Sequence, residues 1–312
     1  MTESVLSSET PAGAFAVKDT FAEAFPMTAT RLIVTADTPA WAAIAGQTTT
    51  GYATSVISCD AEAGVERVLE PDLTPDGRPG VSLLVFAFSR DALEKAVANR
   101  VGQCVMTCPT TACYSGLPVG DKTISVGGRL RYFGDGWQIS KKIGAKRYWR
   151  IPVMDGEFLC EEIFGTVKGV AGGNLILMGK EPAATLAAAE AAVAAMKRCP
   201  DVILPFPGGM ARSGSKVGSK YKALRASTNT AYAPTLRGVV PTEMPAEARC
   251  AYEIVIDGLT LEAVELATAA GLHAAMLHQD ALALVTSGNY GGKLGPFHIR
   301  LHDILSRYPA PG

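Results

Sequence analysis

The chain has 312 residues, of which 48% are hydrophobic, and its 29 basic and 30 acidic residues give a formal net charge of −1. This length predicts two units of roughly 150 residues each, and the balanced charge argues against a general nucleic-acid or anionic-membrane binder. The longest apolar run, VSLLVFAF at 81–88, is far shorter than the ~20 residues of a membrane helix. The first seventeen residues resemble neither a signal nor a transit peptide, so we expect a cytoplasmic protein.

In the first half, short β-branched runs lead directly into helical patterns. RLIVTA at 31–36 precedes a helix that Thr38 would cap and Pro39 would begin. VSLLVFAF precedes a second helix, for which Ser89 is the candidate cap. The stretch 111–150 is typical of hairpins and loops.

The second half repeats this alternation. NLILMG at 174–179 is followed by an alanine-rich helical pattern at 183–199 and by the run DVILPFPG at 201–208. YEIVIDG at 252–258 precedes a helical pattern at 259–276 and the run ALALVTSG at 281–288. At least two strand-helix units in each half indicate an α+β protein with two ferredoxin-like lobes, residues 1–150 and 151–312. One doubly wound parallel sheet is the alternative, but the regular alternation and nucleotide fingerprint that it calls for are missing.

The common catalytic and cofactor motifs are absent. The sequence contains no phosphate loop, no G-x-G-x-x-G and no G-x-S-x-G nucleophile elbow. Cys104, Cys108 and Cys113 cluster, but their C-x3-C and C-x4-C spacings miss the usual zinc pairs. Small buried thiols explain them better, and we expect no metal site.

Four glycine loops, at 74–80, 169–174, 205–215 and 288–295, suggest places where backbone N–H groups hold an anion. No acidic residue lies between Asp201 and Glu243, whereas that interval contains six basic residues. The sequence therefore predicts a cleft for anionic ligands, with ordinary turns and a solvated linker as the alternative. The candidate ligand-binding residues are Gly208, Gly209, Arg212, Ser213, Ser215, Lys216, Lys220, Asn289, Gly291, Gly292 and Lys293.

Glu253 is the candidate acid-base residue because it lies inside the apolar run AYEIVIDG. If its face of the strand is covered, burial would raise the carboxyl pKa and let the group hold or move a proton near neutral pH. The alternative is a solvent-facing glutamate on a half-buried strand.

These stretches resemble the formylmethanofuran:tetrahydromethanopterin formyltransferase family of methanogenic archaea and methylotrophic bacteria. The similar segments extend over nearly the whole chain and include TPDGRPGV (74–81), GVAGGN (169–174), PFPGG (205–209), RSGSKVGSK (212–220), YEIVI (252–256) and GNYGGKLG (288–295). The resemblance implies two ferredoxin-like lobes, the N-terminal one taken as proximal and the C-terminal one as distal. It also implies a homo-oligomer, a tetramer or dimer of dimers, without a prosthetic group.

The resemblance further implies a reaction and its residues. A formyl group would move between the amine of methanofuran and N5 of tetrahydromethanopterin, the two co-substrates, through a tetrahedral intermediate, and the family's catalytic glutamate falls on Glu253. The basic segment 140–150 and the alanine-rich helices are similar to methylotroph members, which implies transfer from formyltetrahydromethanopterin to methanofuran and a complex with formyl-hydrolase subunits. Residues 1–14 and 305–312 extend beyond the family's usual ends. A non-catalytic, coenzyme-binding assembly subunit is the alternative function. A nucleic-acid binder is a third hypothesis, which the few aromatic residues of the basic interval disfavour.

Overall fold

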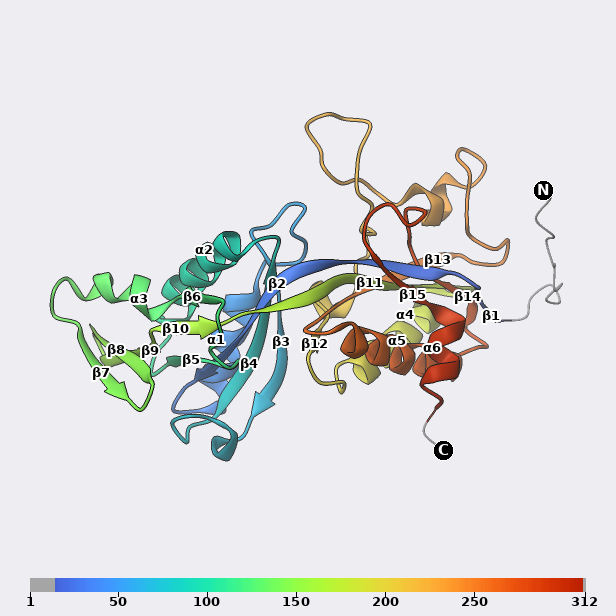
Figure 1. The fold of residues 1–312 in the computed structure, drawn as a ribbon. Helices are drawn as coiled ribbons and strands as arrows, with labels where there is room; N and C mark the ends of the chain where they lie inside the picture. The colour runs from blue at the N-terminus through green and yellow to red at the C-terminus, as the bar shows by residue number, and fades with distance from the viewer. Residues whose placement is uncertain (1–14, 311–312) are drawn as a thin grey trace.

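A computed structural model describes residues 15–310 of the chain. In it, two long strands pass from one lobe into the other (Figure 1). β2 (Phe21–Thr35) and β11 (Val167–Gly179) pair antiparallel at the centre, where Phe25–Ala29 lies against Val167–Ala171. Beyond this pairing each strand joins a different set of neighbours, so that one 13-stranded sheet is continuous through both lobes.

The N-terminal lobe is built on the second half of β2. Its sheet contains, in order, β3 (Glu62–Leu69), β4 (Gly80–Ala87), β2, β5 (Ala112–Ser115), β9 (Gly156–Glu161), β8 (Lys146–Val153) and the edge strand β7 (Ile139–Ile143). The remaining elements of this lobe are α1 (Pro39–Thr50), α2 (Arg90–Arg100), the π-helix η2 (Val101–Val105), the strand pair β6 (Thr123–Ser125) and β10 (Ile163–Gly165), α3 (Gly127–Leu130) and the 3₁₀-helices η1 (Pro71–Leu73) and η3 (Arg131–Gly134). Apart from the four residues of α3 and the turn η3, the stretch 111–150 forms strands and loops, as predicted.

Helix starts agree with the local sequence. The Thr38 hydroxyl accepts a hydrogen bond from the backbone N–H of Trp41 at 3.3 Å, and the Ser89 hydroxyl accepts one from Ala92 at 3.2 Å. Both side chains satisfy a backbone donor that the helix leaves unpaired. The two predicted caps are therefore confirmed.

The C-terminal lobe is built on the second half of β11. Its strands are β12 (Val202–Ile203), β13 (Cys250–Gly258), β11, β14 (Leu282–Thr286) and β1 (Ala16–Val17), and β15 (Phe297–Arg300) pairs with the start of β2. Its helices are α4 (Pro182–Met196), α5 (Leu261–Met276) and α6 (Leu301–Arg307), and its 3₁₀-turns are η4 (Pro207–Gly209), η5 (Thr230–Tyr232) and η6 (Pro234–Leu236). α4 and α5 pack closely, since a Cβ atom at Gly271 would lie only 1.9 Å from the Met196 methyl group.

The structure differs from two expectations. DVILPFPG was expected to be a strand, but only Val202–Ile203 pairs before the proline-rich segment turns into η4, because proline cannot donate to a strand ladder. The expected lobe boundary at residue 150 lies inside β8, and the buried side chain of Phe158 packs in the N-terminal core, whereas Ala22 and Ala24 pack in the C-terminal core. The lobes thus exchange segments of sequence.

Within residues 15–310, no helix is long and apolar enough to cross a bilayer, and no three His, Cys, Asp or Glu side chains are placed to hold a metal ion. Cys113 is buried, whereas Cys104 and Cys108 are partly exposed rather than buried as expected. The N-terminal extension, residues 1–14, lies outside the described residues.

Candidate active site

Glu253 is a buried carboxyl at the centre of the C-terminal lobe. β13 carries it opposite Ile176 of β11, and only 4% of the residue is exposed. Its Oε1 accepts a hydrogen bond from Asn174 Nδ2 at 2.7 Å and one from the Ser215 hydroxyl at 2.5 Å, and its Oε2 accepts one from the Ser215 backbone N–H at 2.7 Å. The predicted covered face is confirmed, and the alternative of a solvent-facing glutamate is wrong.

These surroundings change the acidity of Glu253. Burial raises the carboxyl pKa, and the hydrogen bonds from Ser215 and Asn174 offset only part of that rise. Because Oε1 accepts two hydrogen bonds and Oε2 only one, Oε2 has the free capacity for a proton. The group therefore keeps its proton to higher pH than an ordinary glutamate.

Asn174 is a site residue that the sequence analysis missed. Its Oδ1 accepts a hydrogen bond from the backbone N–H of Gly288 at 2.9 Å, which directs Nδ2 toward Glu253, and its backbone carbonyl accepts one from the Ser287 hydroxyl at 2.7 Å. The available signal was one amide in the otherwise apolar run GGNLILMG. Such a residue in a central strand needs buried partners.

Two cavities meet at Glu253. One, of about 390 Å³, is lined by Arg212, Ser213 and Tyr252 among others, and the second, of about 340 Å³, by Lys18, Lys216 and Asn289 among others. The residues common to both linings are Glu253, Asn229 and Tyr232. Glu253 thus lies where the linings of the two cavities adjoin.

Tyr232, which both cavities share, also keeps its proton. Burial and the carboxylates of Glu243 and Glu253 raise the pKa of Tyr232 to about 12. Its hydroxyl is therefore a neutral hydrogen-bond donor at physiological pH.

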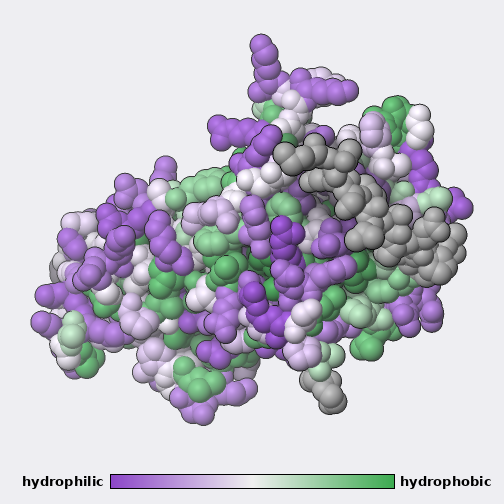
Figure 2. Space-filling view, turned by 45° about the vertical axis from the view of Figure 1, so that its right-hand side comes forward, coloured by the Kyte–Doolittle hydropathy of each residue, from purple (hydrophilic) through white to green (hydrophobic). Residues whose placement is uncertain are grey.

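The structure separates the basic residues between Asp201 and Glu243 into different surroundings. The segment from Ala211 to Lys216 lies beside Glu253, because the Ala211 N–H donates to the Glu253 backbone carbonyl at 2.7 Å. The next turn, with Lys220 among its exposed bases, projects from the C-terminal lobe at the top of Figure 1, and Figure 2 shows this prominence as strongly hydrophilic. Arg237 binds backbone carbonyls of 245–248, so its role is structural. Lys220 lines neither cavity beside Glu253.

The loop 288–295 forms an anion-holding nest, as predicted, but the anion in it is a side-chain carboxylate of the same chain, that of Glu23. The buried Glu23 carboxylate accepts backbone hydrogen bonds from Tyr290 (2.7 Å), Gly292 (3.1 Å), Leu294 and Gly295 (2.8 Å). Burial would raise the pKa of Glu23, yet these four donors outweigh it and lower the pKa. Sequence analysis missed Glu23, whose signal was an acid within the apolar run FAEAF.

This nest also holds the site together. The Tyr290 hydroxyl accepts a hydrogen bond from the Val217 backbone N–H at 2.7 Å, two residues beyond Ser215. The Asn289 amide donates to the Thr20 hydroxyl, and the Gly291 N–H donates to Asn289 Oδ1. Ligand contacts of Asn289, Gly291, Gly292 and Lys293 therefore stay predictions.

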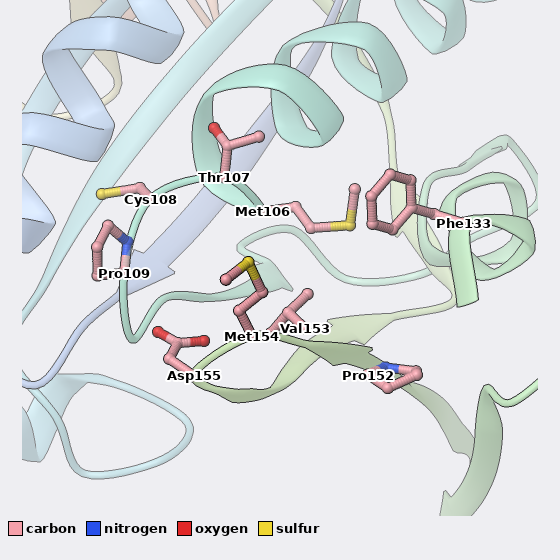
Figure 3. Close-up of a pocket in the computed structure, with 9 residues that line it drawn as sticks. All are labelled: Met106, Thr107, Cys108, Pro109, Phe133, Pro152, Val153, Met154 and Asp155. Carbon is pink, nitrogen blue, oxygen red and sulfur yellow. The ribbon is translucent and has the colours of Figure 1, made fainter. Parts of the chain in front are cut away.

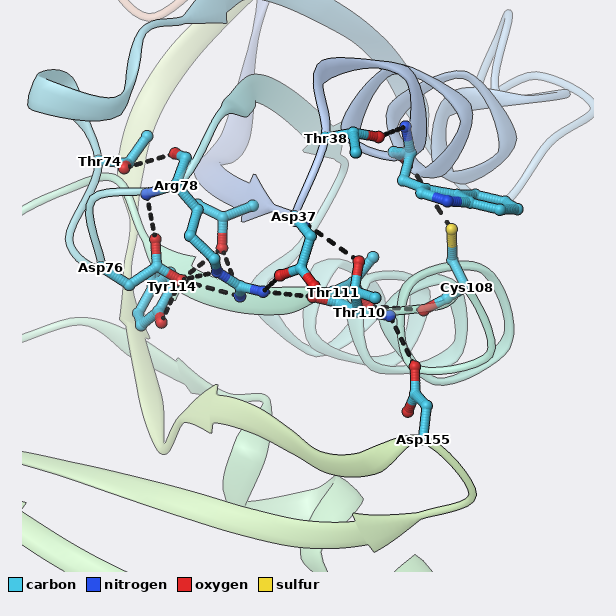
Figure 4. A network of polar contacts seen from close by, with 12 residues as sticks. Asp37, Thr38, Thr74, Asp76, Arg78, Cys108, Thr110, Thr111, Tyr114 and Asp155 are labelled. Carbon is cyan, nitrogen blue, oxygen red and sulfur yellow. Dashed lines mark hydrogen bonds and ion pairs between the residues drawn. The ribbon is translucent and has the colours of Figure 1, made fainter.

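The start of the glycine loop 205–215 and the whole loop 74–80 line neither cavity beside Glu253. Gly208 and Gly209 line a third cavity, of about 470 Å³, together with Lys197. In the loop 74–80, Arg78 Nη1 pairs with Asp37 at 2.9 Å, and Arg78 Nε donates to Asp76, which also accepts a hydrogen bond from the Tyr114 hydroxyl at 2.9 Å (Figure 4). That loop is held by contacts within the N-terminal lobe.

The fold and site define a two-lobed α+β protein in which one buried carboxyl, Glu253, belongs to the lining of two adjacent cavities. Comparison with known families agrees with this class: the family described as formylmethanofuran-tetrahydromethanopterin formyltransferase matches residues 12–153, and the description of its proximal lobe matches residues 156–304. The chain therefore belongs to this formyltransferase family, which confirms the resemblance. The word proximal, however, applies to the C-terminal lobe, the reverse of the expected naming.

Individual relatives cover nearly the whole chain. The formylmethanofuran–tetrahydromethanopterin formyltransferase of Methylococcus capsulatus is 55% identical over 93% of this chain and 98% of its own length. The crystal structure of the formyltransferase/hydrolase complex (FhcABCD) from Methylorubrum extorquens with methylofuran contains a chain that is 52% identical, with a TM-score of 0.89 over 93% of this chain and 96% of that one. The Methanosarcina barkeri formyltransferase structure is 43% identical, with a TM-score of 0.87 over 95% of this chain and 100% of that one. Both structures confirm the two-lobed α+β fold.

Proposed function

We propose that this chain transfers a formyl group between the amine of methanofuran and N5 of tetrahydromethanopterin, with Glu253 as the acid-base residue. The observation that supports this most is the position of the carboxyl, buried and yet part of the lining of two adjacent cavities. A transfer between two bound coenzymes needs both to approach one proton-carrying group at the same time. A hydrolase or a one-substrate enzyme would not need the second cavity.

The chemistry follows from the bonds that change. The attacking nitrogen forms a bond to the formyl carbon, the carbonyl oxygen becomes an oxyanion, and the carbon–nitrogen bond to the leaving coenzyme then breaks. A proton must leave the attacking nitrogen and reach the departing one. Protonated Glu253 can donate a hydrogen bond from Oε2 to the oxyanion or relay this proton. The incoming amine is itself the nucleophile, so the chain need not supply one.

Positive charge near the cavities suits the two coenzymes, which carry a phosphate and glutamyl carboxylates. Arg212 lies on one cavity, and Lys216 and Lys18 lie on the other. Charge-assisted contacts of this kind contribute about 1.5–3 kcal/mol each. Among the other predicted binding residues, Ser213 and Ser215 line the cavities, whereas Gly208, Gly209, Lys220 and Lys293 would contact parts of the coenzymes that extend beyond them.

We further propose the direction from formyltetrahydromethanopterin to methanofuran and residence in a complex with formyl-hydrolase subunits, with the chain itself a homo-oligomer. In support, the relative from Methylorubrum extorquens, 53% identical over 93% of this chain, is one of the subunits of a formyltransferase/hydrolase complex. Hydrolysis of the product would pull an otherwise balanced amine-to-amine transfer forward.

The test is an assay of the purified chain with formyltetrahydromethanopterin and methanofuran, in which formyl exchange is followed in both directions. We expect transfer by the unmodified chain and a decrease of at least ~10²-fold for Glu253→Gln, with Glu262→Gln on the exposed face of α5 as the matched control. Normal turnover of Glu253→Gln would remove this residue from the mechanism. Coenzyme binding without any transfer would instead support the non-catalytic assembly subunit.

A further inference from the structure

The far end of the N-terminal lobe carries an apolar surface that the reaction does not use. Trp137 is 80% exposed and Phe133 65% exposed, and Met154 at the β8–β9 turn is fully exposed. β7 adds the exposed side chains of Ile139 and Ile143. We call these five residues, together with the groove described next, the end surface. Gathered aromatic and long apolar side chains on one exposed end are typical of an interaction site.

A groove of about 640 Å³ opens on this surface (Figure 3). Met106 and Cys108 form one wall, Phe133 and Met154 lie on the other side, and the Met106 thioether points toward the Phe133 ring. The single charged lining residue is Asp155, and its carboxylate already accepts a hydrogen bond from the Thr110 backbone N–H at 2.8 Å (Figure 4). The groove is thus larger than either cavity beside Glu253 and is mainly apolar.

β8 lines the groove with Pro152 and Val153, and its neighbour β7 is positively charged. Edge strand β7 has the sequence ISKKI and pairs only with β8, so its outer edge presents unpaired backbone donors and acceptors. Within residues 15–310, the side chains of Lys141 and Lys142 have no ion-pair or hydrogen-bond partner, whereas Arg150 of β8 is paired with Glu157. A strand added at this edge therefore meets two uncompensated positive charges, one on each face of the sheet.

This charge pattern decides against a second copy of the chain at β7. Antiparallel self-pairing centred on Lys141 would set Lys141 opposite Lys141 and Ser140 opposite Lys142, and parallel pairing would oppose both lysines to themselves. Like charges directly opposite each other destabilise a strand pair. Lysines alone could serve only to protect an edge from aggregation, but that role does not explain the exposed Trp137, Phe133 and Met154.

We propose that the end surface binds an acidic, extended segment of a different protein, with one long apolar side chain of that segment in the groove. Carboxylates of the segment pair with Lys141 and Lys142, and its backbone continues the sheet beyond β7. This interaction does not depend on the proposed transfer reaction, because the end surface and Glu253 belong to different lobes.

The experiment places a photo-crosslinking benzoylphenylalanine at position 133 or 154 of the full chain, in the cells that encode it, with position 277 as the exposed control on the other lobe. We expect an adduct with an acidic segment of another protein, identified by its crosslinked peptide. The adduct yield should fall at least about tenfold in Lys141→Glu with Lys142→Glu, but not in the matched α2 variant Arg90→Glu with Lys95→Glu.

Three outcomes would overturn the proposal: an adduct with a second copy of this chain, no adduct above the position-277 control, or an adduct that charge reversal leaves unchanged. Formyl transfer by the purified Met154→Asp variant should equal that of the unmodified chain. Failure of the transfer reaction in the unmodified chain would reject the proposed function and leave the crosslinking result to be judged separately.

Discussion

Replacement of Glu23 by glutamine tests whether the internal nest stabilises the active site. Each Glu23 oxygen accepts two backbone hydrogen bonds, Oε2 from Tyr290 and Gly292 and Oε1 from Leu294 and Gly295. Glutamine keeps one acceptor oxygen but turns an amide NH₂ toward two of the four donors. A buried N–H without an acceptor costs about 1–3 kcal/mol, so we expect Glu23→Gln to lower the free energy of unfolding by about 2–4 kcal/mol.

The effect should reach turnover through Tyr290. Its hydroxyl holds the Val217 N–H next to the segment that contains Ser215, and Ser215 holds Glu253. Displacement of the loop would loosen that segment, and we expect kcat to fall about tenfold or more, since small misplacements at a reacting centre are costly.

The assays are urea unfolding, hydrogen exchange of the 290–295 amides and steady-state kinetics, with the exposed Glu70→Gln as control. The pKa of folded Glu23 is lowered, so its stabilising contribution is present above the unfolded value of about 4.3 and is lost as pH falls through the folded pKa. The difference between the unmodified chain and Glu23→Gln should therefore shrink in acid. Unchanged stability, exchange and kcat at pH 7 would refute the reasoning.

Three further predictions concern the site and the core. Asn174→Asp replaces a hydrogen-bond donor to Glu253 with an acid and should raise the Glu253 pKa further. We attribute the alkaline decline of the transfer rate to loss of the Glu253 proton. In a pH–rate profile of the variant, this decline should therefore move to higher pH. Arg212→Ala and Lys216→Ala should each raise the KM of one anionic coenzyme by roughly 10- to 100-fold, and equal effects at low and high salt would contradict a charge contact. Gly165→Ala places a Cβ atom 2.1 Å from the Pro118 carbonyl oxygen, so thermal unfolding should show a loss of about 3 kcal/mol or more.

Local signals in the sequence predicted local structure well. Thr38 and Ser89 cap the helices that they were expected to cap, since a cap depends on residues within one turn. The sequence analysis did not anticipate that β2 and β11 extend through both lobes, because their partner strands are far apart in the chain. β3 was also missed, since its sequence EAGVERVL lacks a clear alternation of apolar residues.

The sequence likewise indicated those features of the candidate site that depend on one short segment, but not those that depend on distant partners. The covered position of Glu253 was predicted because a carboxyl inside an apolar strand is conspicuous in one short segment. Asn174 and Glu23 act through partners 79 and about 270 positions away, so only the folded chain shows what they hold. The glycines of 288–295 predicted an anion nest but not that the chain supplies the anion.

The passage of β2 and β11 from one lobe to the other has a kinetic consequence. A hinge between the lobes would have to break hydrogen bonds in the middle of two strands of 15 and 13 residues, so the lobes cannot swing apart to admit or release ligands. We therefore expect entry and departure of the coenzymes to depend on the segments 211–229 and 240–247, which contribute lining residues to the two cavities beside Glu253. Product release, where it limits the rate, should respond to substitutions in these segments and not to changes at the contact between the lobes.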